Sequence, residues 1–88
     1  MEYRAIKTSP QDNVAIAVTT IPKGETVALP DSIMLVANQE IPSGHKIALV
    51  SIAKGADVIR YGEVICQALE GIKPGDWVHV HNTISKIS

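Results

Sequence analysis

The sequence predicts a mainly β domain, a compact unit of short strands with at most one or two short helical turns. Hydrophobic residues make up 45% of the chain and aromatic residues 3%, so the core must be built from Ile, Val, Ala and Leu. Such β-branched and small side chains pack well on a pleated sheet. A glycine turn motif recurs four times, and no long amphipathic helical pattern is present. Because 88 residues are enough for one domain, we expect residues 1–88 to form it.

Four segments share the pattern Ile, two residues, Gly, two residues, and then Val or Ile. They are IPKGETVAL (21–29), IPSGHKIAL (41–49), IAKGADVIR (52–60) and IKPGDWVHV (72–80). We expect the isoleucine to enter the core and the glycine to take a backbone angle that a Cβ would oppose. The prolines of the pattern argue against helix through these stretches. The second pair of segments repeats the first at an offset of 31 residues, which predicts a pseudo-duplicated β unit.

Aliphatic and β-branched runs predict the strands in order. YRAIK opens the chain and VAIAVTT follows; TVAL, KIALVS, DVIR and WVHVH each come after a glycine turn, and IMLVA and VIC lie between them. We therefore expect strands at residues 3–7, 14–20, 26–29, 33–37, 46–51, 57–60, 64–66 and 77–81. Two stretches are ambiguous, because Asp12 could N-cap one helical turn and residues 67–72 could hold another.

Charge and composition exclude several classes of protein. The 8 basic and 9 acidic residues are scattered and give a net charge of −1, so no basic surface is expected to bind nucleic acid. The single cysteine, Cys66, rules out an intrachain disulfide and is typical of a reducing compartment. The N-terminus has no apolar signal-peptide core, and no apolar run approaches the ~20 residues of a membrane helix. We expect a cytoplasmic protein without membrane partners.

Two of the three histidines lie two residues apart in WVHVHN. If residues 77–81 form a strand, Trp77, His79 and His81 share one face, and Val78 and Val80 enter the core. Same-face neighbours are about 7 Å apart along a strand, so both imidazoles can converge on one metal ion. The alternatives are exposed polar residues, a general acid or base, or a contact to a substrate carboxylate.

The third histidine follows a glycine turn. His45 comes directly after Gly44 and could supply a third metal ligand or act as a catalytic acid or base. Lys46 beside it is a charged candidate for the same site. The alternative is a solvated lysine at a turn.

Three stretches together resemble the small domain of the altronate/galactarate dehydratase family, which has the SAF-type β-clip fold. They are DNVAIAV (12–18), IPSGHKIALVSIAKGADVIRYGEVI (41–65) and GDWVHVHN (75–82). The resemblance covers nearly the whole chain, in order and with matching spacing. The combination of GHK, YG and VHVHN is its most specific part.

The chain departs from the family pattern at three positions. Arg60 stands where many relatives have Lys, which keeps the charge. Cys66 stands where Gly is common, which puts a close backbone approach there in doubt. Ser9 stands where some members have His, so any role of that histidine is absent here.

The resemblance implies a function as the small subunit or domain of a carbon–oxygen lyase. Relatives dehydrate sugar acids such as altronate and galactarate with the help of a divalent metal, iron or manganese. A large catalytic subunit of the same family is the implied partner and would share the metal, and the chain alone is expected to be inactive. Self-association stays open. The alternatives are the small subunit of a sulfolactate sulfo-lyase and a non-enzymatic β-clip module that binds sugar acids.

Candidate residues follow from the motifs and the resemblance together. We expect His45 and Lys46 to be catalytic, and His45, His79 and His81 to bind the metal. Substrate-binding candidates are Asn82, Tyr61, Asp12 and Asn13. Each of these four has a structural alternative, because Asn82, Asp12 and Asn13 could cap turns and Tyr61 could pack its ring at a turn.

Overall fold

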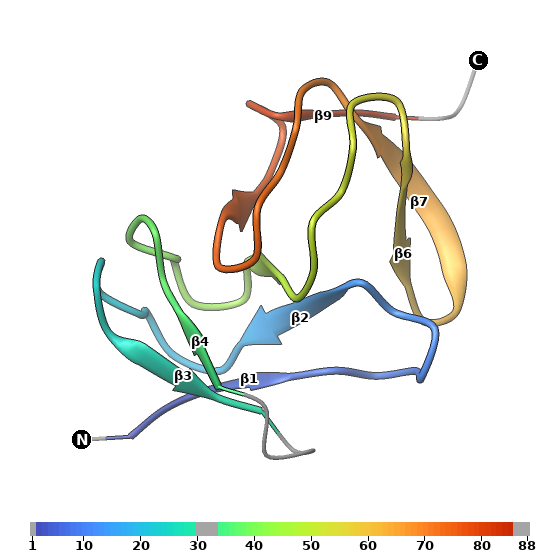
Figure 1. Ribbon diagram of the computed structural model, residues 1–88. Coiled ribbons are helices and arrows are strands. Elements are labelled where there is room, and N and C mark those ends of the chain that lie inside the picture. The colour runs from blue at the N-terminus through green and yellow to red at the C-terminus, as the bar shows by residue number, and fades with distance from the viewer. Residues whose placement is uncertain (1, 30–33, 86–88) are drawn as a thin grey trace.

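The computed structural model describes residues 2–29 and 34–85, and this part of the chain contains strands and turns but no helix. The strands are β1 (Tyr3–Ile6), β2 (Val14–Ala17), β3 (Thr26–Ala28), β4 (Met34–Val36), β5 (Lys46–Ala48), β6 (Asp57–Arg60), β7 (Glu63–Ala68), β8 (Trp77–Val78) and β9 (Thr83–Ser85) (Figure 1). The prediction of a mainly β fold is confirmed. No helix in the described ranges is long and apolar enough to cross a membrane.

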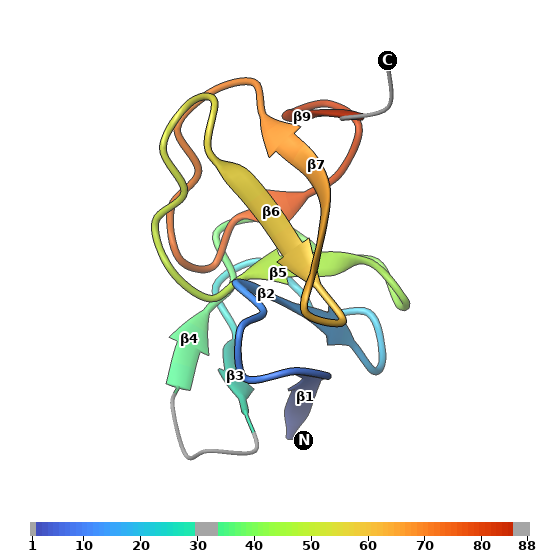
Figure 2. The ribbon, with the colours of Figure 1, turned by 90° about the vertical axis from the view of Figure 1, so that its right-hand side faces the viewer.

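The strands form two sheets. A six-stranded sheet has the order β4-β3-β1-β2-β5-β8, and a three-stranded sheet has the order β6-β7-β9. All pairs are antiparallel except β1 and β3. The β6–β7 hairpin stands beyond β2 and β5, on the side away from β3 and β4 (Figures 1 and 2). The short strands follow from the turn motif, which interrupts the chain every few residues.

The four glycine turns share one hydrogen-bonding pattern. Each glycine N–H donates to the carbonyl of a buried alanine at 2.8–2.9 Å, in the pairs Gly24–Ala37, Gly44–Ala17, Gly55–Ala68 and Gly75–Ala48. Each alanine N–H donates back to the carbonyl of the residue that follows the glycine. All four glycines have φ between 81° and 91°, in the left-handed region that disfavours a Cβ. The turns are therefore clamped to the sheet by backbone bonds that need no particular side chain.

The isoleucines that open the turns pair with one another. Ile21 and Ile41 form an antiparallel bridge, and Ile52 and Ile72 form an equivalent one. In each bridge the N–H groups and carbonyls exchange two hydrogen bonds of 2.8 Å. All four side chains are buried. Full burial of an isoleucine stabilises a fold by about 1.5–3 kcal/mol, so each bridge joins backbone pairing to core formation.

The hydrophobic core consists of two clusters that repeat one another. The first core cluster is Ala5, Ala15, Ala17, Ile21, Val27, Leu29, Leu35, Ala37, Ile41 and Ile47. The second core cluster is Val14, Ala48, Ile52, Val58, Cys66, Ala68, Ile72 and Val78. Seven pairs are related by the 31-residue offset: Ala17/Ala48, Ile21/Ile52, Val27/Val58, Leu35/Cys66, Ala37/Ala68, Ile41/Ile72 and Ile47/Val78. The internal duplication expected from the sequence is thus present in the packing of the described residues.

Several strand boundaries differ from the predictions. Most strands are shorter than expected, and β7 is longer, so it takes up Gln67 and Ala68 where a helical turn was an alternative. The strand expected at 77–81 is wrong beyond Val78, and β9 was not predicted. Residue 33, the first of another expected strand, lies outside the described residues. The cause of the change after Val78 is a turn, described below.

Gly75 is the glycine whose replacement should cost most. Its φ is +91°, and a Cβ at this position would lie 2.1 Å from the Val36 carbonyl oxygen. Gly55 occupies the equivalent turn position with φ +84°, and a Cβ there meets nothing within 4 Å. We expect G55A to lower the free energy of unfolding by about 1–2 kcal/mol, from the left-handed backbone alone. G75A should cost at least about 1 kcal/mol more, because backbone must also move.

Urea denaturation of G75A, G55A and the unmodified chain checks this prediction. Equal losses in the two variants would mean that the close approach of Gly75 to β4 contributes nothing to stability.

Candidate functional site

The glycine turns bring His45 and the histidines of WVHVHN together. His45 follows the Gly44 turn and precedes β5, and β8 is the antiparallel neighbour of β5, with Lys46 opposite Val78. The ring centroids of His45 and His79 are 4.5 Å apart, and the Trp77 ring lies 5.6 Å from each of them. His45 thus forms one aromatic cluster with residues that lie at least 32 positions later in the sequence. We call it the His–Trp cluster: His45, Trp77, His79 and His81.

Trp77 is the centre of this cluster. Its Nε1–H donates to His45 Nδ1 at 3.2 Å, its ring stacks on His79 with an interplanar angle of 10°, and His81 contacts it at 4.9 Å. The side chain is half-buried against the first core cluster. Trp77 is not among the candidate residues of the sequence analysis, so its place in the site was missed. The signal was its position two residues before His79.

A turn held by Asn82 sets the positions of the two C-terminal histidines. Asn82 is buried; its Oδ1 accepts from His79 N at 3.0 Å, and its Nδ2 donates to the Trp77 carbonyl at 2.8 Å. The chain therefore leaves the strand after Val78 instead of continuing it. Val80, expected in the core, is 76% exposed, so that prediction was wrong. Asn82 has the turn-capping role that was its structural alternative, and both ends of its amide are engaged.

The three histidines do not fit a metal centre built by this chain. Among residues 2–29 and 34–85, no group of three His, Cys, Asp or Glu side chains is placed to hold a metal ion. The lone pair of His45 Nδ1 already accepts the Trp77 N–H, and His81 is exposed on the turn. A metal ligand needs a free lone pair. A metal shared with another polypeptide stays a prediction.

His79 has an altered protonation equilibrium. Burial lowers the pKa of its imidazole below the ordinary value of 6.5, because the charged form loses hydration. The nearby charges of His45, Lys46 and His81 lower the pKa further. No hydrogen bond to either ring nitrogen of His79 is present within the described residues. A half-buried, neutral imidazole with a free lone pair at neutral pH is suited to accept a proton.

Asp12, Asn13 and Tyr61 lie away from the His–Trp cluster, at the other end of the β2–β5 pair. At one end of this pair the His45 carbonyl accepts a hydrogen bond from the Ala17 N–H. At the other end the Asn13 carbonyl accepts one from the Leu49 N–H. The structure therefore does not bring these substrate-binding candidates together with the histidines. The sequence could not show that these residues and the histidines lie apart, because both groups belong to the same family motifs.

Asp12 clamps a turn to the tip of the β6–β7 hairpin. Its carboxylate is buried and accepts from Gly62 N at 2.8 Å, Tyr61 N at 3.0 Å and Thr8 Oγ1 at 2.7 Å. Burial acts to raise the pKa of Asp12, but the hydrogen bonds from Gly62, Thr8, Tyr61 and Ser9 outweigh it. The pKa therefore lies below its ordinary value of 3.8. Asp12 does not N-cap a helix.

Tyr61 and Asn13 complete this second region. Tyr61 has φ +57°, a left-handed conformation that is uncommon for an aromatic residue, and the Asp12 carboxylate holds its N–H. Its hydroxyl accepts from Arg60, whose guanidinium lies 4.6 Å from the ring centroid. Asn13 bridges β2 to β6, since its Nδ2 donates to the Asp57 carbonyl and its Oδ1 accepts from Ile59 N. Their observed contacts are structural.

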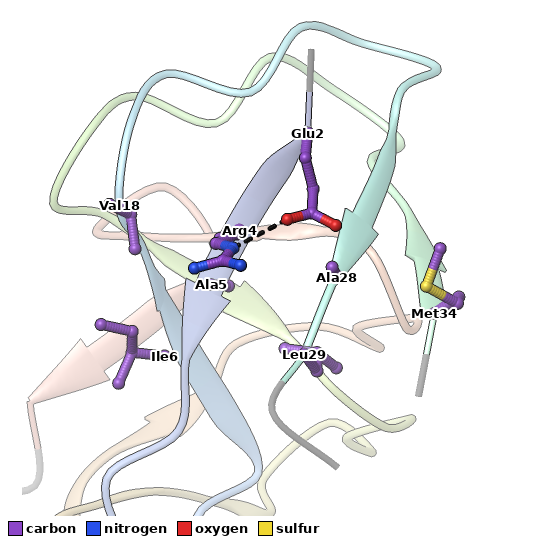
Figure 3. A pocket seen from close by; sticks show the side chains of 8 residues that line it. All are labelled: Glu2, Arg4, Ala5, Ile6, Val18, Ala28, Leu29 and Met34. Atoms are coloured by element: carbon purple, nitrogen blue, oxygen red, sulfur yellow. Dashed lines mark hydrogen bonds and ion pairs between the residues drawn. The ribbon is translucent and has the colours of Figure 1, made fainter. Parts of the chain in front are cut away.

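A separate open groove of about 660 Å³ lies beside β1, β3 and β4 (Figure 3). Its lining is mostly apolar, and its charged groups are Arg4 and Glu2, which form an ion pair of 2.9 Å. Each of these two charges is therefore paired with the other. None of the histidines lines this groove.

Replacing Asp12 should destabilise the fold in a pH-dependent way. We expect Asp12→Asn to lower the free energy of unfolding by about 2 kcal/mol at neutral pH, because an amide cannot accept all of these N–H bonds. The lowered pKa means that the unfolded chain binds the proton more readily. The contribution of Asp12 is therefore complete above pH 3.8 and is lost as the pH falls through the folded-state value.

Chemical denaturation between neutral and acidic pH measures this contribution. Asp57→Asn is the control, since the Asp57 carboxylate accepts a single bond, from Gln67 at 3.3 Å, among the described side chains. An acid-stability profile of Asp12→Asn identical to that of the unmodified chain would contradict the assignment.

The pKa of His79 should rise when Lys46 loses its charge. We expect His79 to titrate below 6.5 in the unmodified chain and closer to 6.5 in Lys46→Met, because the lysine charge opposes protonation. Histidine proton resonances followed by NMR against pH provide the measurement. Lys54→Met is the control, as Lys54 lies in another glycine turn and is exposed. Equal shifts in both variants would rule out a local effect.

Comparison with known proteins agrees with the fold and the motifs. The family model for the altronate/galactarate dehydratase SAF domain matches residues 3–86. The chain is 43% identical over 88 residues to altronate dehydratase of Escherichia coli strain K12, which covers all of this chain and 17% of that protein. It is 41% identical over 73 residues to the galactarate dehydratase (L-threo-forming) of the same strain, covering 83% of this chain and 14% of that protein.

A shorter relative is also similar. The (2R)-sulfolactate sulfo-lyase subunit alpha of Paracoccus pantotrophus is 40% identical over 52 residues, which covers 59% of this chain and 78% of that subunit. The chain thus spans most of a subunit alpha but less than a fifth of either dehydratase. From the match over nearly its whole length, the chain belongs to the SAF-domain family of the altronate/galactarate dehydratases.

Proposed function

We propose that this chain is the small component of a carbon–oxygen lyase that dehydrates a sugar acid of the altronate or galactarate type. It acts with a larger polypeptide that completes the active site, and it is inactive alone. The observation that carries the proposal is the 4.5 Å approach of His45 and His79, which come from the two histidine-bearing motifs of the chain.

The histidine pair supplies the acid–base chemistry that such a dehydration needs. A base removes the proton α to the carboxylate, and the electron pair left on carbon forms the double bond as the β C–O bond breaks. The hydroxyl leaves as water after it takes a proton, and the enol product rearranges to a 2-keto acid. His79, with a lowered pKa, is suited to accept the α-proton and then to pass it to the leaving oxygen, and His45 is suited to hold that oxygen by a hydrogen bond.

Lys46 supplies positive charge near His79. Negative charge builds up on the carboxylate oxygens as the α-proton leaves, and a fixed cation lowers that barrier. The charge of Lys46 reaches the histidine pair, since it is one of the causes of the lowered His79 pKa. A loss of Lys46 should therefore affect catalysis more than folding.

A divalent metal, iron or manganese, remains part of the proposal, with its ligands drawn largely from the larger polypeptide. The free lone pair of His79 is used for the α-proton, so this chain would leave the ion to the ligands of the larger polypeptide. The bound ion would supply further positive charge for the carboxylate and the leaving oxygen.

A sulfo-lyase role is the second candidate. The similarity to subunit alpha of the sulfolactate sulfo-lyase, over 78% of that subunit, favours a separate small subunit with sulfite as the leaving group. The same histidine pair would act at the α-carbon, and the C–S bond would break in place of the C–O bond.

Reconstitution with a larger polypeptide of the same family tests the proposal. We expect the mixture, but neither chain alone, to convert altronate or galactarate to a 2-keto acid. His79→Gln should lower kcat by about 10²–10⁴-fold, as expected when a general base is lost, and His45→Gln by about 10²–10³-fold, as expected when a hydrogen-bond donor to a developing negative charge is lost. Release of sulfite from sulfolactate by the same mixture would select the second candidate.

Lys46→Gln and Lys54→Gln form the matched pair in this assay. The first should lower kcat and the second should leave it unchanged, with both variants still bound to the larger polypeptide. Full activity of His79→Gln and His45→Gln in an intact complex would sink the proposal.

A further inference from the structure

We infer that Trp77 is a positioning residue that fixes His45 in the tautomer with its proton on Nε2, so that His45 presents a hydrogen-bond donor to an oxygen of the ligand. This role deepens the proposed function and rests on it for the identity of the ligand. The assignment of the tautomer itself rests on the geometry of the His–Trp cluster alone.

The direction of one hydrogen bond decides the tautomer. The indole Nε1–H of tryptophan is a donor and has no acceptor capacity. Because it lies 3.2 Å from His45 Nδ1 as donor, Nδ1 must offer a lone pair. A neutral imidazole carries its single proton on the other nitrogen, so His45 holds it on Nε2.

The indole is held in place from several sides, so it can impose this state. Trp77 N donates to Gln39 Oε1 at 2.9 Å, and the Trp77 carbonyl accepts from Asn82 Nδ2 at 2.8 Å. The ring packs against the first core cluster and stacks on His79. The indole therefore cannot turn its N–H away from His45 without loss of core packing and of the stack.

The consequence is chemical. His45 has no free lone pair in this tautomer, because Nδ1 is engaged and Nε2 is protonated. It therefore cannot bind a metal ion as it lies, but it can donate from Nε2 to an oxygen. A hydroxyl or carboxylate oxygen of a hydroxy acid is an acceptor of that kind. His79, 4.5 Å away, keeps the complementary role of proton acceptor.

Nitrogen NMR on the 88-residue chain tests the inference directly. At about pH 8.5, roughly two units above the ordinary histidine pKa, His45 is expected to show a protonated Nε2 and an unprotonated Nδ1. A through-hydrogen-bond coupling between Trp77 Nε1 and His45 Nδ1 should be visible. A proton on Nδ1 of the unmodified chain would overturn the inference without any variant being made.

Two substitutions then separate positioning from packing. Trp77→Phe removes the N–H, and replacement of Trp77 by benzothienylalanine removes it while the bicyclic shape is kept, which covers the case in which Trp77→Phe does not fold. Both should abolish the coupling and leave His45 in a mixture of the two tautomers. Tyr3→Phe, which removes a ring donor elsewhere against the same core cluster, should leave His45 unchanged. A single Nε2–H state that persists after loss of the indole N–H would show that Trp77 only packs.

An activity measurement on the reconstituted complex adds a second readout. The benzothienylalanine form should lose at least tenfold in kcat with less than a twofold change in KM, because donation to the leaving oxygen matters in the transition state. Unchanged kcat would overturn the catalytic consequence. If the unmodified complex has no lyase activity, the proposed function fails, whereas the tautomer measured by NMR still decides the role of Trp77.

Discussion

The backbone bond between each turn glycine and its alanine is the constraint on which the rest of this structure depends. A glycine with φ near +85° donates its N–H to the carbonyl of an alanine. The alanine N–H donates in turn to the carbonyl of the residue after the glycine. Repetition of this unit produces two bridged isoleucine pairs and two similar core clusters. A thin core can thus be organised by many short strands instead of a few long ones.

The position of the candidate site follows from that repetition. The Gly44 and Gly75 turns are equivalent. β5 follows the first turn and β8 follows the second, and these two strands pair with each other. The residues that leave these two turns must therefore meet. His45 and Lys46 come from one copy, and Trp77 and His79 come from the other. The scaffold is duplicated, whereas the chemistry is not, because the equivalent positions carry different side chains.

The Asp12 region connects two parts of the scaffold. One carboxylate binds backbone N–H groups from two segments and supports a tyrosine in a left-handed conformation. Such strain persists only where surrounding contacts hold it, and here Asp12 supplies them. The region therefore couples the hairpin of the three-stranded sheet to the start of β2.

The sequence by itself determined the class of fold, the duplication and the family, because Ile-x-x-Gly spacing and β-branched composition are local properties. It also picked out His45 and His79, since histidines are rare in this chain. Only the tertiary structure decided which of the candidate residues meet. Asn82 bends the chain after Val78, so His79 reaches His45 through a turn and not along a strand face, and Val80 becomes exposed. Asp12 and Asn13 resemble ligands in the sequence, but each binds backbone groups that lie more than 40 residues away. The role of Trp77 depends on an N–H···N bond across two strands, which no spacing within one segment could reveal.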